Sequence, residues 1–140
     1  MDARTRAVIE ELRVVADPTR KPGMARVGIA VDRALGVSIP NLRRVARAHR
    51  RDHELAAALW QTEIHEARIL ASMIDDPPQV GRAQMDEWAP QVDSWDLCDQ
   101  LCNNLWRHTR SAASAARSWA SHDHEYVRRA AFSLVAAQAV

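Results

Sequence analysis

Ser94-Trp95-Asp96-Leu97-Cys98-Asp99-Gln100-Leu101-Cys102 is an apolar run that carries two carboxylates beside a tryptophan. On a helix, at about 100° per residue, its apolar side chains fall on one stripe, as expected for a helix packed on a core. That stripe consists of Leu97, Cys98, Leu101, Cys102 and Leu105. Burying an ionised carboxylate without a partner costs several kcal/mol, so acids in such a helix point to a groove in which they are used. The stretch therefore predicts a helix that forms one wall of an active site.

The same helical wheel places Trp95, Asp99 and Trp106 along one edge of the stripe. A carboxylate at that edge is half shielded and still reaches a groove. The alternative is structural: Asp96 and Asp99 are first-turn acids that the helix dipole favours. Spacing alone does not separate these two interpretations.

The rest of the chain also predicts helices, because no segment alternates with period two and β-branched and aromatic residues are few. The expected helices cover residues 2–16, 25–35, 39–50, 53–61, 63–75, 83–89, 94–108, 110–121 and 124–138. Short helices joined by short turns favour an all-α solenoid of HEAT-like helical hairpins, and an irregular compact helical bundle is the alternative. We expect one domain over residues 1–140.

Bulk composition fits an ordinary globular protein, with 47% hydrophobic and 26% charged residues in 140. No apolar run approaches the roughly 20 residues that span a bilayer, and the first residues do not resemble a signal peptide. Two cysteines four residues apart are typical of reduced cytoplasmic thiols. We therefore expect a cytoplasmic protein with no membrane partner.

Charge is distributed unevenly along the chain. Residues 1–60 carry twelve Arg or Lys against seven acids, whereas residues 61–109 carry three against nine. A basic first part suits a polyanion, and an acidic middle suits a cationic centre, although both can be plain solvated surfaces.

Basic residues form two candidate phosphate-binding groups. Arg43, Arg47, Arg50 and Arg51 stand three or four apart, so a helix over 39–50 would present them as one ridge. The alternative is an ordinary exposed face. Arg128 and Arg129 open the last helix about 100° apart, so only one of them can face a given groove.

No metal or cofactor is expected. Cys98 and Cys102 with His108 supply at most three ligands, and no second cysteine pair or phosphate-binding glycine loop is present. The wheel buries Cys98, so it is a core residue and not a nucleophile.

Several stretches in this order resemble the DNA alkylation repair family, the AlkD-like HEAT-repeat DNA glycosylases. They are 34–43 (ALGVSIPNLR), 59–60 (LW), 64–74 (IHEARILASMI), 85–88 (MDEW), 94–102 (SWDLCDQLC) and 125–132 (EYVRRAAF). The resemblance covers nearly the whole chain. It implies a helical solenoid that holds duplex DNA and hydrolyses the glycosidic bond of cationic alkylated purines.

The resemblance also implies residue roles. Asp99 corresponds to the catalytic carboxylate of the family, Trp95 to the tryptophan one turn before it, and Arg129 to an arginine that contacts phosphate. Members of the family are longer, so we expect the chain to lack their C-terminal repeats.

The leading expectation is therefore a DNA glycosylase, with Asp99 and Trp95 at the reaction centre and Arg129, Arg128 and the Arg43 ridge on DNA. The alternative is a non-catalytic scaffold for DNA or protein. The last helix ends on the apolar stretch 133–140, which also predicts self-association.

Overall fold

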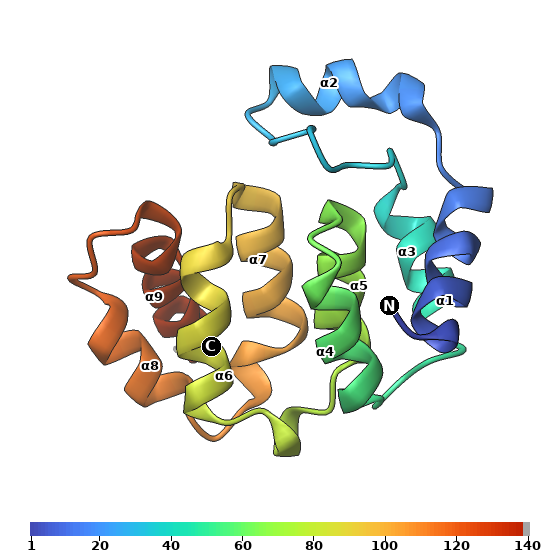
Figure 1. Cartoon of the computed structure of the whole chain (residues 1–140). Coiled ribbons are helices and arrows are strands. Elements are labelled where there is room, and N and C mark those ends of the chain that lie inside the picture. The colour runs from blue at the N-terminus through green and yellow to red at the C-terminus, as the bar shows by residue number, and fades with distance from the viewer. Residues whose placement is uncertain (139–140) are drawn as a thin grey trace. The chain divides into compact units, whose positions relative to one another are not determined.

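The computed structural model describes residues 1–138, and within them every regular element is a helix (Figure 1). The α-helices are α1 (Ala3–Val14), α2 (Lys21–Arg26), α3 (Ile39–Ala46), α4 (His53–Gln61), α5 (His65–Ile74), α6 (Arg82–Trp88), α7 (Trp95–Asn104), α8 (Ala112–Trp119) and α9 (Glu125–Gln138). The all-α prediction is confirmed. The end of the predicted apolar stretch, Ala139 and Val140, lies outside the described residues.

The chain divides into two compact units, Met1–Asp75 and Asp76–Val140. The boundary falls in Asp75-Asp76-Pro77-Pro78, directly after α5. Proline cannot continue a helix that precedes it, so this stretch separates the two units. The sequence expectation of one domain over 1–140 stays a prediction.

The first unit contains two layers of helices. α4 and α5 form a hairpin, while α1 packs on α4 and α3 packs on α5. The fully buried side chains between them include Leu12, Leu42, Leu59 and Leu70. Local signals set the helix starts: the Ser38 hydroxyl accepts the Asn41 N–H at 3.3 Å and so begins α3.

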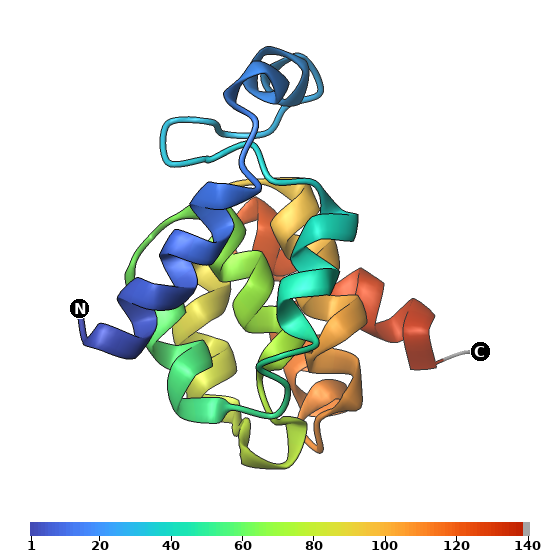
Figure 2. The same ribbon diagram turned by 90° about the vertical axis from the view of Figure 1, so that its right-hand side faces the viewer.

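The predicted helix over residues 25–35 is wrong. The helix in this region is α2, Lys21–Arg26, which begins with Pro22 in its first turn, where proline costs no hydrogen bond. The chain after it is irregular, and Gly28 has a φ of 83°, a conformation that ends a helix. α2 buries none of its side chains and stands away from the other helices of the unit (Figures 1 and 2).

Glu66 holds the segment between α2 and α3 against the other helices of the first unit. Its carboxylate is buried and accepts the backbone N–H groups of Leu35, Gly36 and Val37 at 2.8, 2.8 and 3.1 Å. Backbone donors that would otherwise be buried without partners are thereby satisfied. The charge on Glu66 therefore positions the segment that leads into α3.

The second unit repeats the two-layer arrangement. α8 and α9 form a hairpin, α7 packs on α9 and α6 packs on α8. The indole N–H of Trp119 donates to Asp86 at 2.8 Å, which ties α8 to α6. Both units thus consist of layered antiparallel hairpins, as the solenoid prediction requires. None of the described helices is long and apolar enough to cross a membrane.

Candidate active site

α7 positions the two residues that the sequence singled out as catalytic. Its inner face buries Leu97, Cys98, Leu101 and Cys102, as the wheel predicts. The outer edge carries Trp95, which is 37% exposed, and Asp99, whose side chain is 31% exposed. The carboxylate is therefore half shielded at the rim of the core, where we expect it.

Trp106 does not join them, so its predicted place on the edge is wrong. α7 ends at Asn104, and Trp106 begins a short 3-10 turn. The change of helix type rotates the side chain out of the α-helical register. Trp106 is fully buried and packs edge-to-face on Trp119, with ring centroids 5.1 Å apart.

α9 runs parallel to α7 at close range. The Cys98 thiol donates to the Tyr126 carbonyl at 3.4 Å, and the Cys102 thiol donates to the Ala130 carbonyl at 3.8 Å. From the first hydrogen bond to the second, the donor and the acceptor each advance by four residues toward the C-terminus. The two helices are therefore parallel and in register. This register places the first turn of α9 beside the middle of α7.

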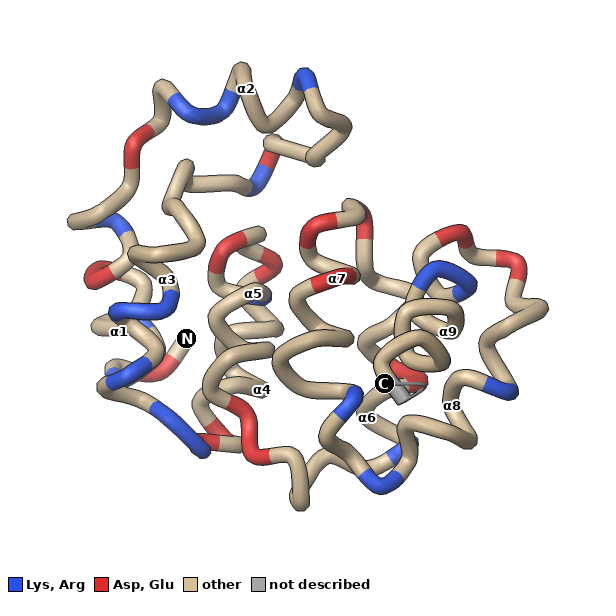
Figure 3. Tube along the Cα trace, turned by 180° about the vertical axis from the view of Figure 1, so that it is seen from behind, with Lys and Arg blue, Asp and Glu red and all other residues tan. Residues whose placement is uncertain are grey.

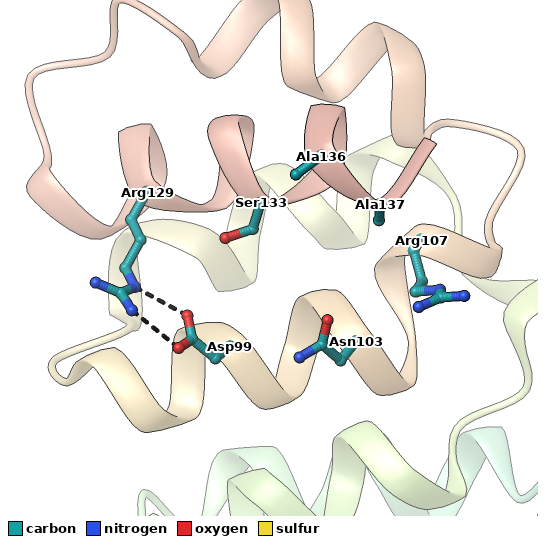
Figure 4. A pocket seen from close by; sticks show the side chains of 7 residues that line it. All are labelled: Asp99, Asn103, Arg107, Arg129, Ser133, Ala136 and Ala137. Atoms are coloured by element: carbon teal, nitrogen blue, oxygen red, sulfur yellow. Dashed lines mark hydrogen bonds and ion pairs between the residues drawn. The ribbon is translucent and has the colours of Figure 1, made fainter. Parts of the chain in front are cut away.

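The register brings Asp99 and Arg129 together in a bidentate ion pair. Arg129 Nε donates to Asp99 Oδ1 at 2.8 Å, and Arg129 Nη2 donates to Oδ2 at 2.9 Å (Figure 4). The hydrogen bond to Asp99 raises the pKa of Arg129, against the opposing effect of burial. The family resemblance implies separate roles for these residues, as the catalytic carboxylate and as a phosphate contact, and the fold makes them partners.

The pair lies at one end of an open groove between α7 and α9 (Figure 4). The groove has a volume of about 380 Å³. It is lined by Asp99, Asn103, Arg107, Arg129, Ser133, Ala136 and Ala137. It belongs entirely to the second unit.

Arg128 takes a different direction from Arg129, as their spacing requires. Its guanidinium Nη1 donates to the carbonyls of His122 and Asp123, each at 2.8 Å. The side chain is therefore folded back over the loop before α9 and does not line the groove. A role of Arg128 on DNA stays a prediction.

The basic ridge of the first unit is shorter than the sequence indicated. α3 ends at Ala46, so Arg43 and Arg47 keep a helical spacing while Arg50 and Arg51 lie in the following turn. The turn forms because Arg51 adopts a φ of 57° and Asp52 caps α4 by accepting the Leu55 N–H. Figure 3 shows the basic positions along α3 and in the chain that leads to α4.

Arg43, Arg47 and Arg50 are exposed, and their guanidinium groups have no ion-pair partner among the described residues. They belong to the first unit, whereas the groove belongs to the second. Their role on DNA stays a prediction.

The cysteines are buried in the second unit and do not face the groove. A hydrogen bond with Cys98, together with burial, raises the pKa of the Cys102 thiol. In the part of the chain that the structure describes, no three His, Cys, Asp or Glu side chains gather to hold a metal ion. The absence of a metal or cofactor in the function stays a prediction.

Arg107, Ser133 and Asn103 line the groove, although the sequence alone did not indicate them as site residues. A signal was present, because Asn103 and Arg107 follow Asp99 at steps of four residues. Ser133 follows Arg129 by the same step. Only the contact between α7 and α9 shows that the two rows face one another.

The fold has a close counterpart among solved structures. A chain described as one of "a new family of proteins related to the HEAT-like repeat DNA glycosylases with affinity for branched DNA structures" superimposes with a TM-score of 0.85 at 23% identity. The match covers 96% of this chain and 56% of that chain. At this identity the likeness establishes the fold, and the prediction of HEAT-like hairpins is confirmed.

The family follows from the sequence. The model of the DNA alkylation repair enzyme family matches residues 8–139, and the chain therefore belongs to that family. A comparison with curated protein sequences finds no match. The chain spans a little over half the length of the solved relative that it resembles.

Proposed function

We propose that this protein is a DNA glycosylase that hydrolyses the N-glycosidic bond of cationic alkylated purines in duplex DNA. The observation that supports this proposal is the Asp99 carboxylate at the end of an open groove, with the exposed Trp95 one turn before it on the same helix. Membership of the DNA alkylation repair enzyme family agrees with it. Action on genomic DNA would place the protein in the cytoplasm, beside the nucleoid.

The chemistry needs little beyond a positioned negative charge. An alkylated purine already carries a positive charge, so it leaves with the electron pair of the C1′–N bond and becomes neutral. The sugar is left as an oxocarbenium ion, to which water adds while it releases a proton. No strong general acid is required, and stabilising the developing cation is the main task.

Asp99 supplies that stabilisation. A carboxylate about 4 Å from the cation contributes about 4 kcal/mol at an effective dielectric near 20. This corresponds to roughly a thousandfold in rate. Trp95, exposed on the same edge, packs against the sugar or the base and excludes water from one side.

Arg129 determines how strongly the Asp99 charge acts on the substrate, because it pairs with the same carboxylate. Its guanidinium engages both Asp99 oxygens in the free protein. A phosphate offers the same two-oxygen geometry to an arginine fork, so a bound DNA backbone competes for Arg129. Once Arg129 turns to phosphate, the Asp99 charge faces the sugar.

The test is release of free base from methylated duplex DNA under single-turnover conditions. Asp99→Asn should slow release by about a hundredfold to a thousandfold, because the shape remains and the charge is lost. Asp96→Asn is the matched control, with the same substitution one turn earlier in α7, and it should change the rate less than about threefold. Equal rates for wild type and Asp99→Asn would exclude Asp99 as the catalytic carboxylate.

A second candidate is binding of DNA without catalysis. The solved relative is described as having affinity for branched DNA structures. Binding of this protein to a linear duplex and to a four-way junction of the same sequence distinguishes the two functions. Tighter binding to the junction, with no base release from methylated DNA, would favour this candidate over the glycosylase.

We also infer that α9 mediates self-association. Phe132 is 67% exposed and Val135 is 58% exposed, and the two lie three residues apart on one helical face. Sedimentation velocity over a range of concentrations should show a weight-average mass that rises for wild type and stays monomeric for Phe132→Glu. Val14→Glu alters an apolar side chain of α1 that is 83% exposed, and as a control it should behave like wild type.

A further inference from the structure

The groove between α7 and α9 continues well beyond the Asp99–Arg129 pair. Asp99, Asn103 and Arg107 follow one another at four-residue steps on one side, and Arg129, Ser133 and Ala137 do so on the other. The first two partners are 30 residues apart, and the same offset relates the next two pairs. The parallel register of α7 and α9 explains the first two pairs, whereas Arg107 lies in the short 3-10 turn after α7. Figure 4 shows the residues in the same order along the groove.

The far end of the groove has a positive charge that no acidic side chain among the described residues pairs with. At the near end Arg129 is neutralised by Asp99. Asn103 and Ser133, in the middle, are polar and uncharged. At the far end the groove is lined by Arg107 and Ala137, and the methyl group of Ala137 supplies no counter-charge.

Arg107 is available to bind an anion. It is exposed, and its guanidinium has no hydrogen-bond or ion-pair partner among the described residues. An arginine that stabilised the fold would contact a carboxylate or a carbonyl, as Arg128 does. The free planar fork of Arg107 suits the oxygens of a phosphate.

The length of the groove fits more than one phosphate. On the α9 side, the eight residues from Arg129 to Ala137 are continuous helix and rise roughly 12 Å along the groove. One strand of B-DNA carries a phosphate about every 3.4 Å of helix axis. A strand that lies along this groove therefore presents several phosphates between its two ends.

We propose that this groove is a track for one strand of the DNA backbone, with Arg129 and Arg107 as phosphate contacts at its two ends. Asn103 and Ser133 hydrogen-bond to the sugar and phosphate oxygens between them. The track orients the strand so that one nucleotide lies beside Asp99. This inference rests on the proposed function, because it requires DNA as the ligand. It assigns Arg107 a role in positioning the strand and no role in breaking the glycosidic bond.

The test measures the affinity of an undamaged, fluorescein-labelled 20-base-pair duplex across a range of salt concentrations. Each phosphate contact contributes about 0.9 to the slope of log affinity against log salt, so Arg107→Gln should make the slope shallower by about that amount. At 0.1 M salt the same relation gives a loss of about eightfold in affinity. Arg107→Lys keeps the charge and should restore most of the slope.

Arg117→Gln is the matched control, because Arg117 is an exposed arginine of α8 that does not line the groove. It should bind DNA like wild type. Thermal unfolding should give the same midpoint for wild type, Arg107→Gln and Arg117→Gln, since none of the exchanged groups is buried.

Base release separates positioning from chemistry. With methylated DNA at low protein, Arg107→Gln should fall behind wild type by the loss in affinity and should regain most of the rate as protein is raised, whereas Asp99→Asn stays slow at both concentrations. If wild type binds duplex and Arg107→Gln matches Arg117→Gln in slope and affinity, this inference is overturned and the proposed function stands. If wild type binds no DNA even at low salt, the proposed function fails, and the track fails with it.

Discussion

Gly36 is a residue whose identity is set by the backbone. Its φ of 84° lies in the left-handed region, and a Cβ there would overlap the carbonyl oxygen of Asp17. The close approach is stabilised by a hydrogen bond from the Asp17 N–H to the Gly36 carbonyl at 2.9 Å. The contact joins the two ends of the segment that contains α2.

Gly36→Ala should therefore destabilise the protein by at least about 2 kcal/mol, from backbone strain and displacement of Asp17 together. The free energy of unfolding, measured with urea, provides the check. Gly23→Ala is the control, because Gly23 lies in α2 with no atom within 4 Å of a Cβ. It should be neutral or up to about 1 kcal/mol stabilising, and equal effects at the two sites would contradict the strain argument.

Cys102 is protected from reaction by its surroundings. A hydrogen bond with Cys98 and burial raise its pKa, which keeps the neutral thiol present at pH 7 to 9, and only a thiolate reacts readily. We expect the folded protein to react with a disulfide reagent at least about 100-fold more slowly than the same chain in guanidinium, because reaction waits for local opening. Fast labelling of one thiol in the folded state would show that α7 opens easily.

At the scale of elements, the Asp99–Arg129 pair links α7 to α9 without contributing much to stability. Both side chains are partly exposed, at 31% and 46%, so water screens their attraction. The pKa of Arg129 is raised in the folded protein. Its contribution to folding stability is therefore fully present at any pH below the ordinary arginine pKa, and it is lost only as the pH rises through the raised pKa. The pair is therefore insensitive to Arg129 titration at neutral pH.

A double-mutant cycle with Asp99→Asn and Arg129→Gln should give a coupling energy below about 1 kcal/mol in unfolding experiments. The same two substitutions should affect base release far more strongly. A coupling of several kcal/mol would indicate instead that the pair exists to hold the two helices together.

Individual helices were predictable where a local signal sets both ends. The predicted helix over 53–61 coincides with α4, whose cap is Asp52. The predictions over 39–50 and 94–108 ran too far, because apolar periodicity continues past Ala46, where α3 ends, and past Leu105, which leaves the helical conformation. The predicted helix over 25–35 is wrong because Gly28 adopts a positive φ directly after α2, which periodicity does not detect.

At the scale of the molecule, basic residues of the first unit are the remaining prediction for DNA contact. Arg43 and Arg47 are exposed on α3, with no ion pair among the described residues. If both contact phosphate, the double variant Arg43→Gln/Arg47→Gln should make the salt slope of duplex binding shallower by about 1.8. Arg13→Gln is the control, because Arg13 pairs with Glu10 on α1. A slope equal to wild type would limit DNA contact to other surfaces.

The sequence by itself determined the helical class, the family, and the choice of Asp99, Trp95 and Arg129. The helical class follows from local periodicity and capping, and the family and these three candidate residues follow from short motifs that resemble the DNA alkylation repair family. All of these signals depend on residues close together in the chain. Tertiary structure alone decided that Asp99 and Arg129 form one pair, that Arg128 turns away, and that Asn103, Arg107 and Ser133 share their groove. The reason is the parallel register of α7 and α9, which joins residues 30 apart through packing that no local pattern encodes.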